Sequence, residues 1–155
     1  YSLVRRIIFQ DLGLAAHDVI PECGCTVAEE LLRPTHIYTE AVQVVLREFK
    51  ISGMAHITGG GLYDNLPRIL PSACQARLQG QNWEVPSIFS FLQRKGDISD
   101  YEMYRVFNNG IGFALVVSAS HLEGALELLH GMGEKAFHIG TIHSREAKEP
   151  PVVIE

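Results

Sequence analysis

Three consecutive glycines, Gly59, Gly60 and Gly61, are the residues that most strongly indicate a binding site in this chain. A run of glycines is costly in a packed element, because glycine loses more backbone freedom on folding than any other residue. The apolar residues 54–57 before them are typical of a buried strand, and the amphipathic residues 62–70 after them of a helix. A glycine turn between a strand and a helix can direct several backbone N–H groups at one anion.

Two polar side chains flank this turn, the titratable ring of His56 and the hydroxyl group of Thr58. The alternative is a tight strand-to-helix connection that binds nothing, since glycines are common in turns of every kind. The stretch matches neither the phosphate loop, which ends in Gly-Lys-Ser/Thr, nor the dinucleotide-binding fingerprint. On spacing alone, residues 58–61 predict a turn that binds an anion or a substrate.

A second polar turn, residues 107–112, places Asn108, Asn109 and two glycines directly before an apolar strand. Asparagine tolerates left-handed backbone and Asn-Gly is a common turn signal, so a simple connection between helix and strand is the alternative. Arg105 lies three residues after Glu102 on the preceding helix. It either pairs with that carboxylate on the helix surface or faces a cleft beside the first turn.

The cysteines and the remaining histidines give no metal site. Cys23, Cys25 and Cys74 are odd in number and too few for a secreted disulfide framework. Cys23-Gly24-Cys25 resembles the start of a metal site, but no second closely spaced pair completes a tetrahedral set. No metal ligand is therefore assigned. We interpret the other histidines as surface, cap or sheet residues: His17, His121, His130, His138 and His143.

Seven helices are predicted from apolar spacing and capping residues. The first three cover residues 3–12, a short segment that Thr26 caps with Glu29 in a capping box, and residues 36–49, which Thr35 caps and where Ile37 faces inward. The fourth covers residues 62–70 and is shortened at Pro67. The last three are a segment that starts at Pro86, a segment from Ser99 or Asp100 to Phe107, and residues 122–129, which Ser120 caps.

The predicted strands are residues 55–58, 73–78, 111–117, 137–142 and 151–154, the last at a sheet edge because of its prolines. Helices interleaved with four to five strands indicate an α/β (α+β) fold. We expect a layered sandwich with one mixed sheet of four to five strands, partly ferredoxin-like. No internal repeat or linker divides residues 1–155, so we expect a single domain.

Composition narrows the class of protein. With 155 residues, 46% of them hydrophobic and 20% charged, the chain is an ordinary globular sequence. Its net charge of −5 argues against nucleic acid as a partner, because phosphate backbones bind basic surfaces. No apolar run approaches the ~20 residues that span a bilayer, and no signal segment opens the chain. We therefore expect no membrane partner and a cytoplasmic location.

Four segments resemble motifs of the aminoimidazole ribonucleotide synthetases, the phosphoribosylformylglycinamidine cyclo-ligases of purine biosynthesis. Residues 56–61, His-Ile-Thr-Gly-Gly-Gly, followed by residues 65–71, are similar to the family's glycine motif. Residues 1–5, 31–38 and 102–112 are similar to three further motifs, in the same order and spacing. The resemblance covers the whole chain.

The chain departs from the family pattern at two positions and at its start. His36 stands where arginine is usual, and Asn109 stands where methionine or another less polar residue is usual. The sequence opens within a family motif. We therefore expect residues 1–155 to be the C-terminal domain, without the N-terminal half that binds ATP.

The resemblance implies an ATP-dependent ligase, a homodimer in its full form, that converts formylglycinamidine ribonucleotide to aminoimidazole ribonucleotide. Such enzymes transfer the γ-phosphoryl group of ATP to the formyl oxygen, a nitrogen on the amidine side attacks, and phosphate departs as the imidazole ring closes. ATP and Mg²⁺ are expected to bind mainly to the N-terminal half. The isolated domain, which would pack beside that half, is expected to be inactive.

The resemblance also implies roles for the two turns. His56 is the expected catalytic residue, as a donor to the developing oxyanion or as a proton shuttle. The expected substrate-binding residues are Thr58, Gly59, Gly60, Gly61, Arg105 and Asn108.

Two alternatives stay open. A sister enzyme of the superfamily, such as a selenophosphate synthetase, a thiamine-monophosphate kinase or formylglycinamidine ribonucleotide synthase, would share the architecture. A non-catalytic binding domain would use the same turns only for packing.

Overall fold

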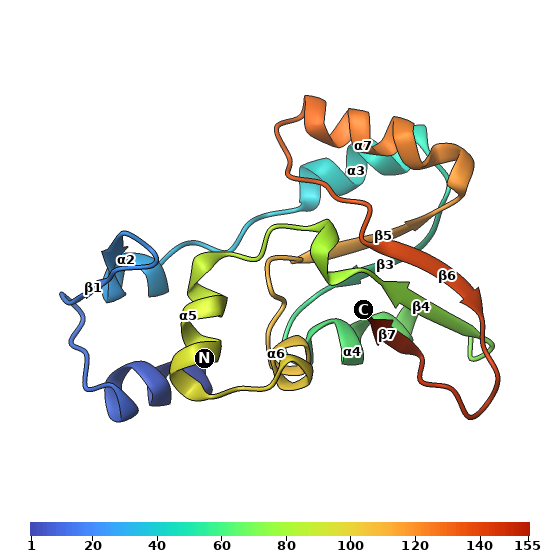
Figure 1. Ribbon diagram of the computed structural model, residues 1–155. Helices are drawn as coiled ribbons and strands as arrows, with labels where there is room; N and C mark the ends of the chain where they lie inside the picture. The colour runs from blue at the N-terminus through green and yellow to red at the C-terminus, as the bar shows by residue number, and fades with distance from the viewer.

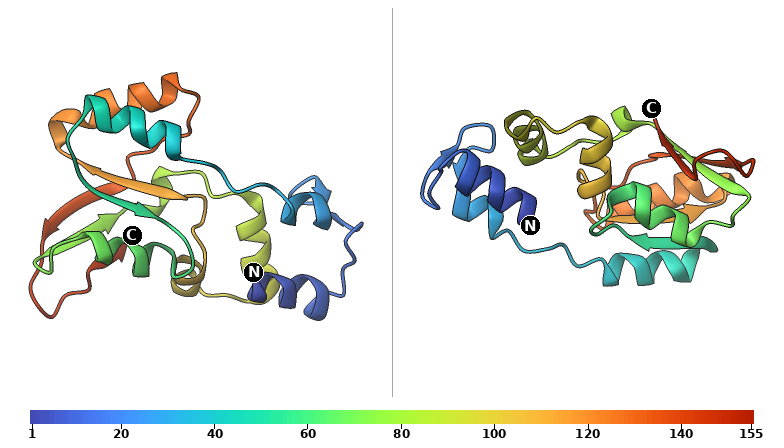
Figure 2. Two further views of the ribbon diagram at one scale, coloured as in Figure 1. Left: turned by 180° about the vertical axis from the view of Figure 1, so that it is seen from behind. Right: turned by 90° about the horizontal axis from the view of Figure 1, so that it is seen from below.

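Two hydrophobic cores organise the molecule, which the computed structural model describes over residues 1–155 (Figure 1). The smaller core joins an N-terminal lobe to helix α5 (Ser87–Gly96), whose buried side chains are Ile88, Phe91 and Leu92. The larger core lies within the body of the fold, around Leu62, Trp83 and the strands. The extended segment 33–38 connects the lobe to the body, as Figure 2 shows from behind and from below.

The N-terminal lobe consists of short elements. Helix α1 (Ser2–Arg5) continues into a π-helical turn (Arg6–Asp11). Two two-residue strands, β1 (Val19–Ile20) and β2 (Cys25–Thr26), pair antiparallel and lead into α2 (Val27–Leu31). The helix predicted over residues 3–12 is confirmed, whereas the small hairpin lies where the sequence predicted no strand.

The predicted capping box of α2 is confirmed. The backbone N–H of Glu29 donates to the Thr26 hydroxyl group at 3.2 Å, and the Thr26 N–H donates to the Glu29 carboxylate at 2.8 Å. The N–H and the hydroxyl group of Thr26 both donate to the Glu29 carboxylate, and they lower the pKa of Glu29 because they stabilise its charged form.

The body alternates helices and strands. Its helices are α3 (Thr39–Glu48), α4 (Gly61–Asn65), α6 (Asp100–Val106) and α7 (Leu122–Gly131), with 3₁₀ turns at Leu66–Ile69, Gly80–Asn82 and Ala119–His121. Its strands are β3 (Ile51–His56), β4 (Cys74–Leu78), β5 (Phe113–Val117), β6 (Gly140–Ser144) and β7 (Val152–Ile154). Helices α3 and α7 lie together over β3 and β5 (Figure 1).

The five body strands form two sheets. Strand β3 pairs antiparallel with β5, and β4 lies between an antiparallel β6 and a parallel β7. The second sheet is mixed and has β7 at its edge, as predicted. The prediction of one mixed sheet of four to five strands is wrong, and no ferredoxin-like sheet is observed. Strand patterns show which residues are extended, but not which strand edges bond to one another.

The helix predicted from residue 36 begins later, at Thr39, and Thr35 does not cap it. Ile37, predicted to face inward, is 79% exposed. Pro34 favours extended backbone in the residue before it. Tyr38 then packs against Gly112 and lies 5.4 Å, between ring centroids, from Phe113, so a tertiary contact keeps this segment out of the helix.

Other boundaries shift or hold according to local chemistry. Ser120 lies inside a 3₁₀ turn and bonds to the Ser118 hydroxyl group, so it does not cap α7 as predicted. The strand predicted from residue 137 begins at Gly140. By contrast, Ser99 caps α6 by accepting from the Glu102 N–H, as predicted. The helix after the glycines is shortened near Pro67, also as predicted: α4 ends at Asn65, and a 3₁₀ turn covers Leu66–Ile69. No helix combines the length and the apolar character needed to cross a bilayer.

Candidate functional site

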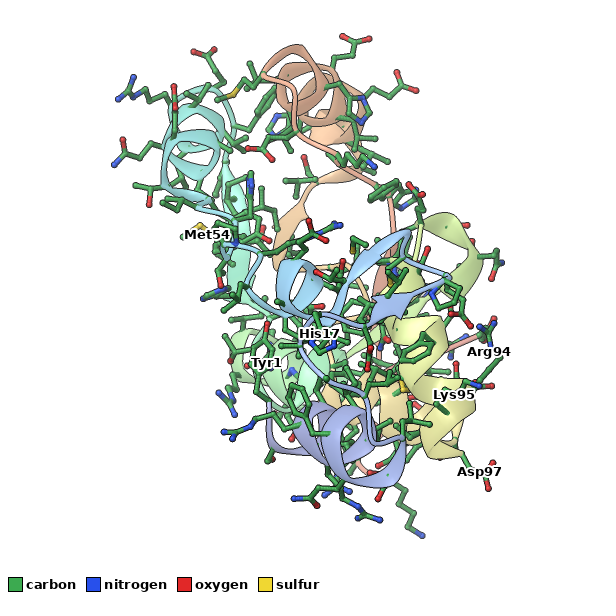
Figure 3. The ribbon with its side chains drawn as sticks, turned by 90° about the vertical axis from the view of Figure 1, so that its left-hand side faces the viewer. Tyr1, His17, Met54, Arg94, Lys95 and Asp97 are labelled. Atoms are coloured by element: carbon green, nitrogen blue, oxygen red, sulfur yellow. The ribbon has the colours of Figure 1, made fainter.

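His56 is the last residue of β3 and is exposed. Its ring stacks on Phe113, its partner in β5, with centroids 6.1 Å apart. The Tyr38 ring meets it at an angle of 63°, with centroids 6.0 Å apart. Met54, two residues earlier on the same face of the strand, is 40% exposed and lies at the surface in Figure 3. The aromatic neighbours thus hold the imidazole at an exposed position at the end of β3.

The fold itself requires two of the three glycines in the turn of residues 58–61, here called the glycine turn. Gly60 and Gly61 have positive φ values of 98° and 55°. A side chain on Gly61 would collide with the backbone oxygens of Tyr104 and Phe107, and one on Gly60 would lie 2.6 Å from Asp64. The turn therefore packs directly on the C-terminal end of α6.

Gly59 differs from its two neighbours. Its φ is not in the left-handed region, and a β-carbon built on it would meet no atom within 4 Å. It is also exposed. Neither backbone strain nor internal packing accounts for a glycine here.

The backbone N–H groups of Thr58, Gly59 and Gly60 have no hydrogen-bond acceptor within the chain, whereas the Gly61 N–H donates to the Thr58 carbonyl at 3.0 Å. The buried amide group of Asn65 donates to the carbonyls of Gly61, Gly59 and Thr58, at 2.8, 3.3 and 3.4 Å. In a planar trans peptide the N–H points opposite to the C=O. Asn65 therefore directs the N–H groups of Gly59 and Gly60 away from the protein.

Asn65 lies in the segment 65–71 that resembles the family's glycine motif, but the sequence predicted no role for it. The spacing could have shown this role, because Asn65 lies four positions after Gly61, and a side chain at that distance on a helix reaches back to the preceding turn. The sequence likewise predicted no role for Tyr38, because only the folded chain brings that ring to His56.

The second turn, residues 107–112, is here called the asparagine turn, and it is held by internal hydrogen bonds. Asn108 accepts from the Gly110 N–H at 3.1 Å. Asn109 has a φ of 48° and is 3% exposed, and its amide group donates to the carbonyls of Met103 and Phe107. Its own carbonyl accepts from the Trp83 ring at 3.1 Å. Asn109 thus closes the C-terminal end of α6.

Arg105 is exposed and bonds to the Glu102 carboxylate at 3.0 Å, so the surface pair considered from the sequence is the observed geometry. This hydrogen bond raises the pKa of Arg105, and the charge of Asp64 on α4 adds to the effect. The guanidinium group is therefore held on the exposed surface of α6 by Glu102.

The two turns lie side by side. The Ile57 N–H donates to the Gly112 carbonyl at 2.8 Å, and Gly61 packs on the carbonyl of Phe107. A cavity of about 390 Å³ lies beside them, between α3, α7 and β5, but neither His56 nor Thr58 lines it. The structure thus brings His56 and the glycine turn together on an open surface, with the asparagine turn behind them.

The chain contains no group of three or more His, Cys, Asp or Glu side chains that could hold a metal ion. Its three cysteines form no disulfide and are half-buried. Burial raises the pKa of the Cys23 and Cys25 thiols, which disfavours the thiolate form that acts as a ligand or nucleophile.

Comparison with known proteins gives a consistent result over the whole chain. The family model described as "AIR synthase related protein, C-terminal domain" matches residues 1–152. A phosphoribosylformylglycinamidine cyclo-ligase of Desulfatibacillum aliphaticivorans is 48% identical over 145 residues, which are 94% of this chain and 42% of that protein. The cyclo-ligase of Trichlorobacter lovleyi is 47% identical over 154 residues, 99% of this chain and 44% of that protein. The chain thus spans less than half the length of these relatives.

Proposed function

The chain belongs to the family of AIR synthase related proteins, as their C-terminal domain, and we propose that it is the substrate-side domain of a phosphoribosylformylglycinamidine cyclo-ligase. Relatives that carry this name match nearly its whole length at 46 to 48% identity. The reaction closes the imidazole ring of formylglycinamidine ribonucleotide at the expense of ATP, a step of purine biosynthesis.

Ring closure needs a better leaving group than the formyl oxygen. The γ-phosphoryl group of ATP passes to that oxygen, and the ring nitrogen on the amidine side then attacks the formyl carbon. The carbon–oxygen bond breaks, phosphate leaves with the former formyl oxygen, and loss of a proton gives aminoimidazole ribonucleotide. A protein promotes such a reaction mainly by positioning the groups and stabilising developing negative charge.

The unpaired N–H groups of the glycine turn are the observation that carries this proposal. The N–H groups of Thr58, Gly59 and Gly60 have no acceptor in the chain, and Asn65 directs two of them outward. Several adjacent N–H donors form a site for an oxyanion or a phosphoryl group. We assign to them the formyl oxygen of the substrate and its phosphorylated form, and Gly59 leaves that group room to approach.

His56 lies at the end of β3 next to this turn and is the proposed catalytic residue, either as a donor to the oxyanion or as a proton shuttle. Thr58 and Asn108 would orient polar groups of the same substrate; Asn108 retains its NH₂ group for this purpose while its oxygen holds Gly110. Arg105 would contact the substrate by giving up its hydrogen bond to Glu102 and donating to the substrate instead.

The remaining parts of the proposal concern the full enzyme. Because this chain has no cluster of metal ligands, we assign it no role in holding Mg²⁺ and derive no step through a metal. ATP and Mg²⁺ would bind mainly to the N-terminal half, which would also cover the open face at His56. The enzyme would be a cytoplasmic homodimer, and the 155-residue chain alone would release no ADP above background.

Turnover of the full-length enzyme with His56 variants tests the assignment. His56→Ala should lower kcat by at least about tenfold, as removal of a general acid or a charge-stabilising donor does. His56→Gln separates the two roles, because glutamine keeps a donor but does not titrate. Recovery of most activity by glutamine indicates a donor, whereas an equal loss in both variants indicates a shuttle. The exposed His17 provides the control His17→Ala, which should leave kcat unchanged.

Calorimetry with formylglycinamidine ribonucleotide tests binding separately from chemistry. Binding by the full-length enzyme that weakens in the His56 and Gly59 variants supports the site. If neither the chain nor the full-length enzyme binds this nucleotide, the proposed function is wrong.

A further inference from the structure

A second hollow, of about 560 Å³, lies on the other side of α6, between α4, α5 and the C-terminal strand. This volume is within the range of ligand pockets in proteins. Its walls carry four aromatic side chains from three helices: Tyr63, Phe89, Tyr101 and Tyr104. None of the residues proposed above to act on the substrate lines it.

All charged side chains that line this hollow are negative. Asp100 and Glu155 line it, and no lysine, arginine or histidine does. Of the nearby cations, Arg105 bonds to Glu102, and Arg94 on α5 bonds to Glu22 of the N-terminal lobe at 2.7 Å. Figure 3 shows Arg94 and Lys95 projecting from the surface of α5. The hollow is therefore both acidic and free of a resident cation.

Two of the four aromatic rings lie against each other. The centroids of Tyr63 and Tyr101 are 5.0 Å apart. Burial raises the pKa of Tyr63 and Tyr104, so both phenols stay neutral. Asp100 and Tyr104 are four positions apart on α6 and both line the hollow. Gln93 donates to Asp100 at 2.5 Å, which holds the carboxylate in place.

We propose that this hollow binds an organic ammonium ion. The faces of aromatic rings attract a cation through the ring quadrupole, and quaternary and primary ammonium groups bind in such aromatic cages. Asp100 supplies the opposite charge, while Gln81 and Ser90 offer hydrogen bonds to a polar body attached to the ammonium group. An anion would meet two carboxylates and no cationic side chain in the lining, so it would be repelled.

Titration of the 155-residue chain with tetramethylammonium at constant ionic strength, followed by tyrosine fluorescence and by amide shifts in α6, tests this proposal. Neopentyl alcohol, which has nearly the same shape and no charge, is the matched probe. We expect saturable binding of tetramethylammonium and at least about fivefold weaker binding of the alcohol.

Variants of Tyr101, which is 57% exposed, locate the site without removing a core residue. Tyr101→Leu should weaken tetramethylammonium binding at least about fivefold, whereas Tyr101→Phe keeps the ring and should bind as the unchanged chain does. Asp100→Asn should also weaken binding. Tyr1→Leu removes a tyrosine that is 80% exposed and outside the hollow, so it should change nothing.

Three outcomes would overturn the proposal: no saturable binding, equal binding of the neutral alcohol, or unchanged binding by folded Tyr101→Leu. Equal binding of the alcohol would identify an apolar hollow without selectivity for charge. Because no residue of the hollow takes part in the proposed cyclo-ligase chemistry, none of these outcomes bears on that function.

Discussion

The glycine turn and the asparagine turn are adjacent in space and similar in composition, but they use their polar groups differently. In the asparagine turn, Asn108 and Asn109 bond to the backbone of residues 103–110, and the Trp83 ring bonds to the Asn109 carbonyl. In the glycine turn no side chain of residues 58–61 forms a hydrogen bond, and the amide group of Asn65 fixes the turn through the carbonyls of Thr58, Gly59 and Gly61.

This difference shows how a ligand-binding turn can be separated from a structural one. Glycine content does not separate them, since Gly60, Gly61 and Gly110 all have positive φ and close neighbours. Backbone donors without an acceptor do not separate them either, since the N–H groups of Asn108 and Asn109 also have none within the chain. What separates them is that Asn65 fixes the carbonyls of Thr58 and Gly59, so that the next two N–H groups of this exposed turn point away from Asn65. Gly59 adds a second criterion, a glycine for which the fold gives no steric reason.

Gly61→Ala is the change expected to have the largest effect. The new methyl group would overlap the carbonyls of Tyr104 and Phe107, and alanine disfavours a φ of 55°. We expect the free energy of unfolding to fall by about 3 kcal/mol or more, measured by urea denaturation. A loss below about 1 kcal/mol would mean that the turn does not pack on α6 as described.

Asn109→Ala should have the next largest effect, a loss of about 2–3 kcal/mol in the free energy of unfolding. It leaves the Phe107 carbonyl without a donor, removes one of the two donors of the Met103 carbonyl, and places alanine at a φ of 48°. Asn109→Gly is the matched variant, because glycine accepts the φ but not the hydrogen bonds. If the glycine variant is as stable as the unchanged chain, the hydrogen bonds contribute nothing and backbone conformation alone maintains this turn.

Asn108→Ala should cost only about 1 kcal/mol, since it removes one hydrogen bond, to the Gly110 N–H, from a half-buried position. Asn108→Asp keeps the accepting oxygen and should retain most of the stability in thermal unfolding. Equal losses in both variants would show that the amide NH₂ group, and not this oxygen, stabilises the asparagine turn.

Sequence reasoning succeeded where the decisive partner is a near neighbour in the chain. The capping box at Thr26, the cap at Ser99 and the short helix before Pro67 each depend on residues at most four positions apart. It failed where a distant partner decides. Tyr38 leaves the predicted helix to pack on Gly112, and the pairing of strands into two sheets follows no local pattern.

The candidate site shows the same division. The sequence located the glycine turn and the neighbouring His56 from residue types and spacing. It did not distinguish Gly61 from Gly59, because the atoms that make this distinction belong to Tyr104 and Phe107, more than forty positions later. Gly60 differs from Gly59 through its positive φ and its close approach to Asp64, which glycine spacing alone does not show. The orientation of the free N–H groups likewise became visible only with the hydrogen bonds of Asn65.

Gly59→Ala should have the smallest effect on stability, and it therefore best separates a role of the glycine turn in binding from a role in the fold. Its methyl group would meet no atom within 4 Å, and φ is not in the left-handed region, so the free energy of unfolding should change by less than about 0.5 kcal/mol. If the N–H groups bind the substrate, the same methyl group obstructs the approach of the substrate to them, and calorimetry with the full-length enzyme should show at least about tenfold weaker binding of formylglycinamidine ribonucleotide.

Thr39→Ala, at the exposed start of α3, is a control that should change neither the free energy of unfolding nor the affinity for this nucleotide strongly. Unchanged affinity in Gly59→Ala would place the substrate elsewhere and leave the free N–H groups to solvent, whereas a large loss of stability would show that Gly59, like Gly61, serves the fold.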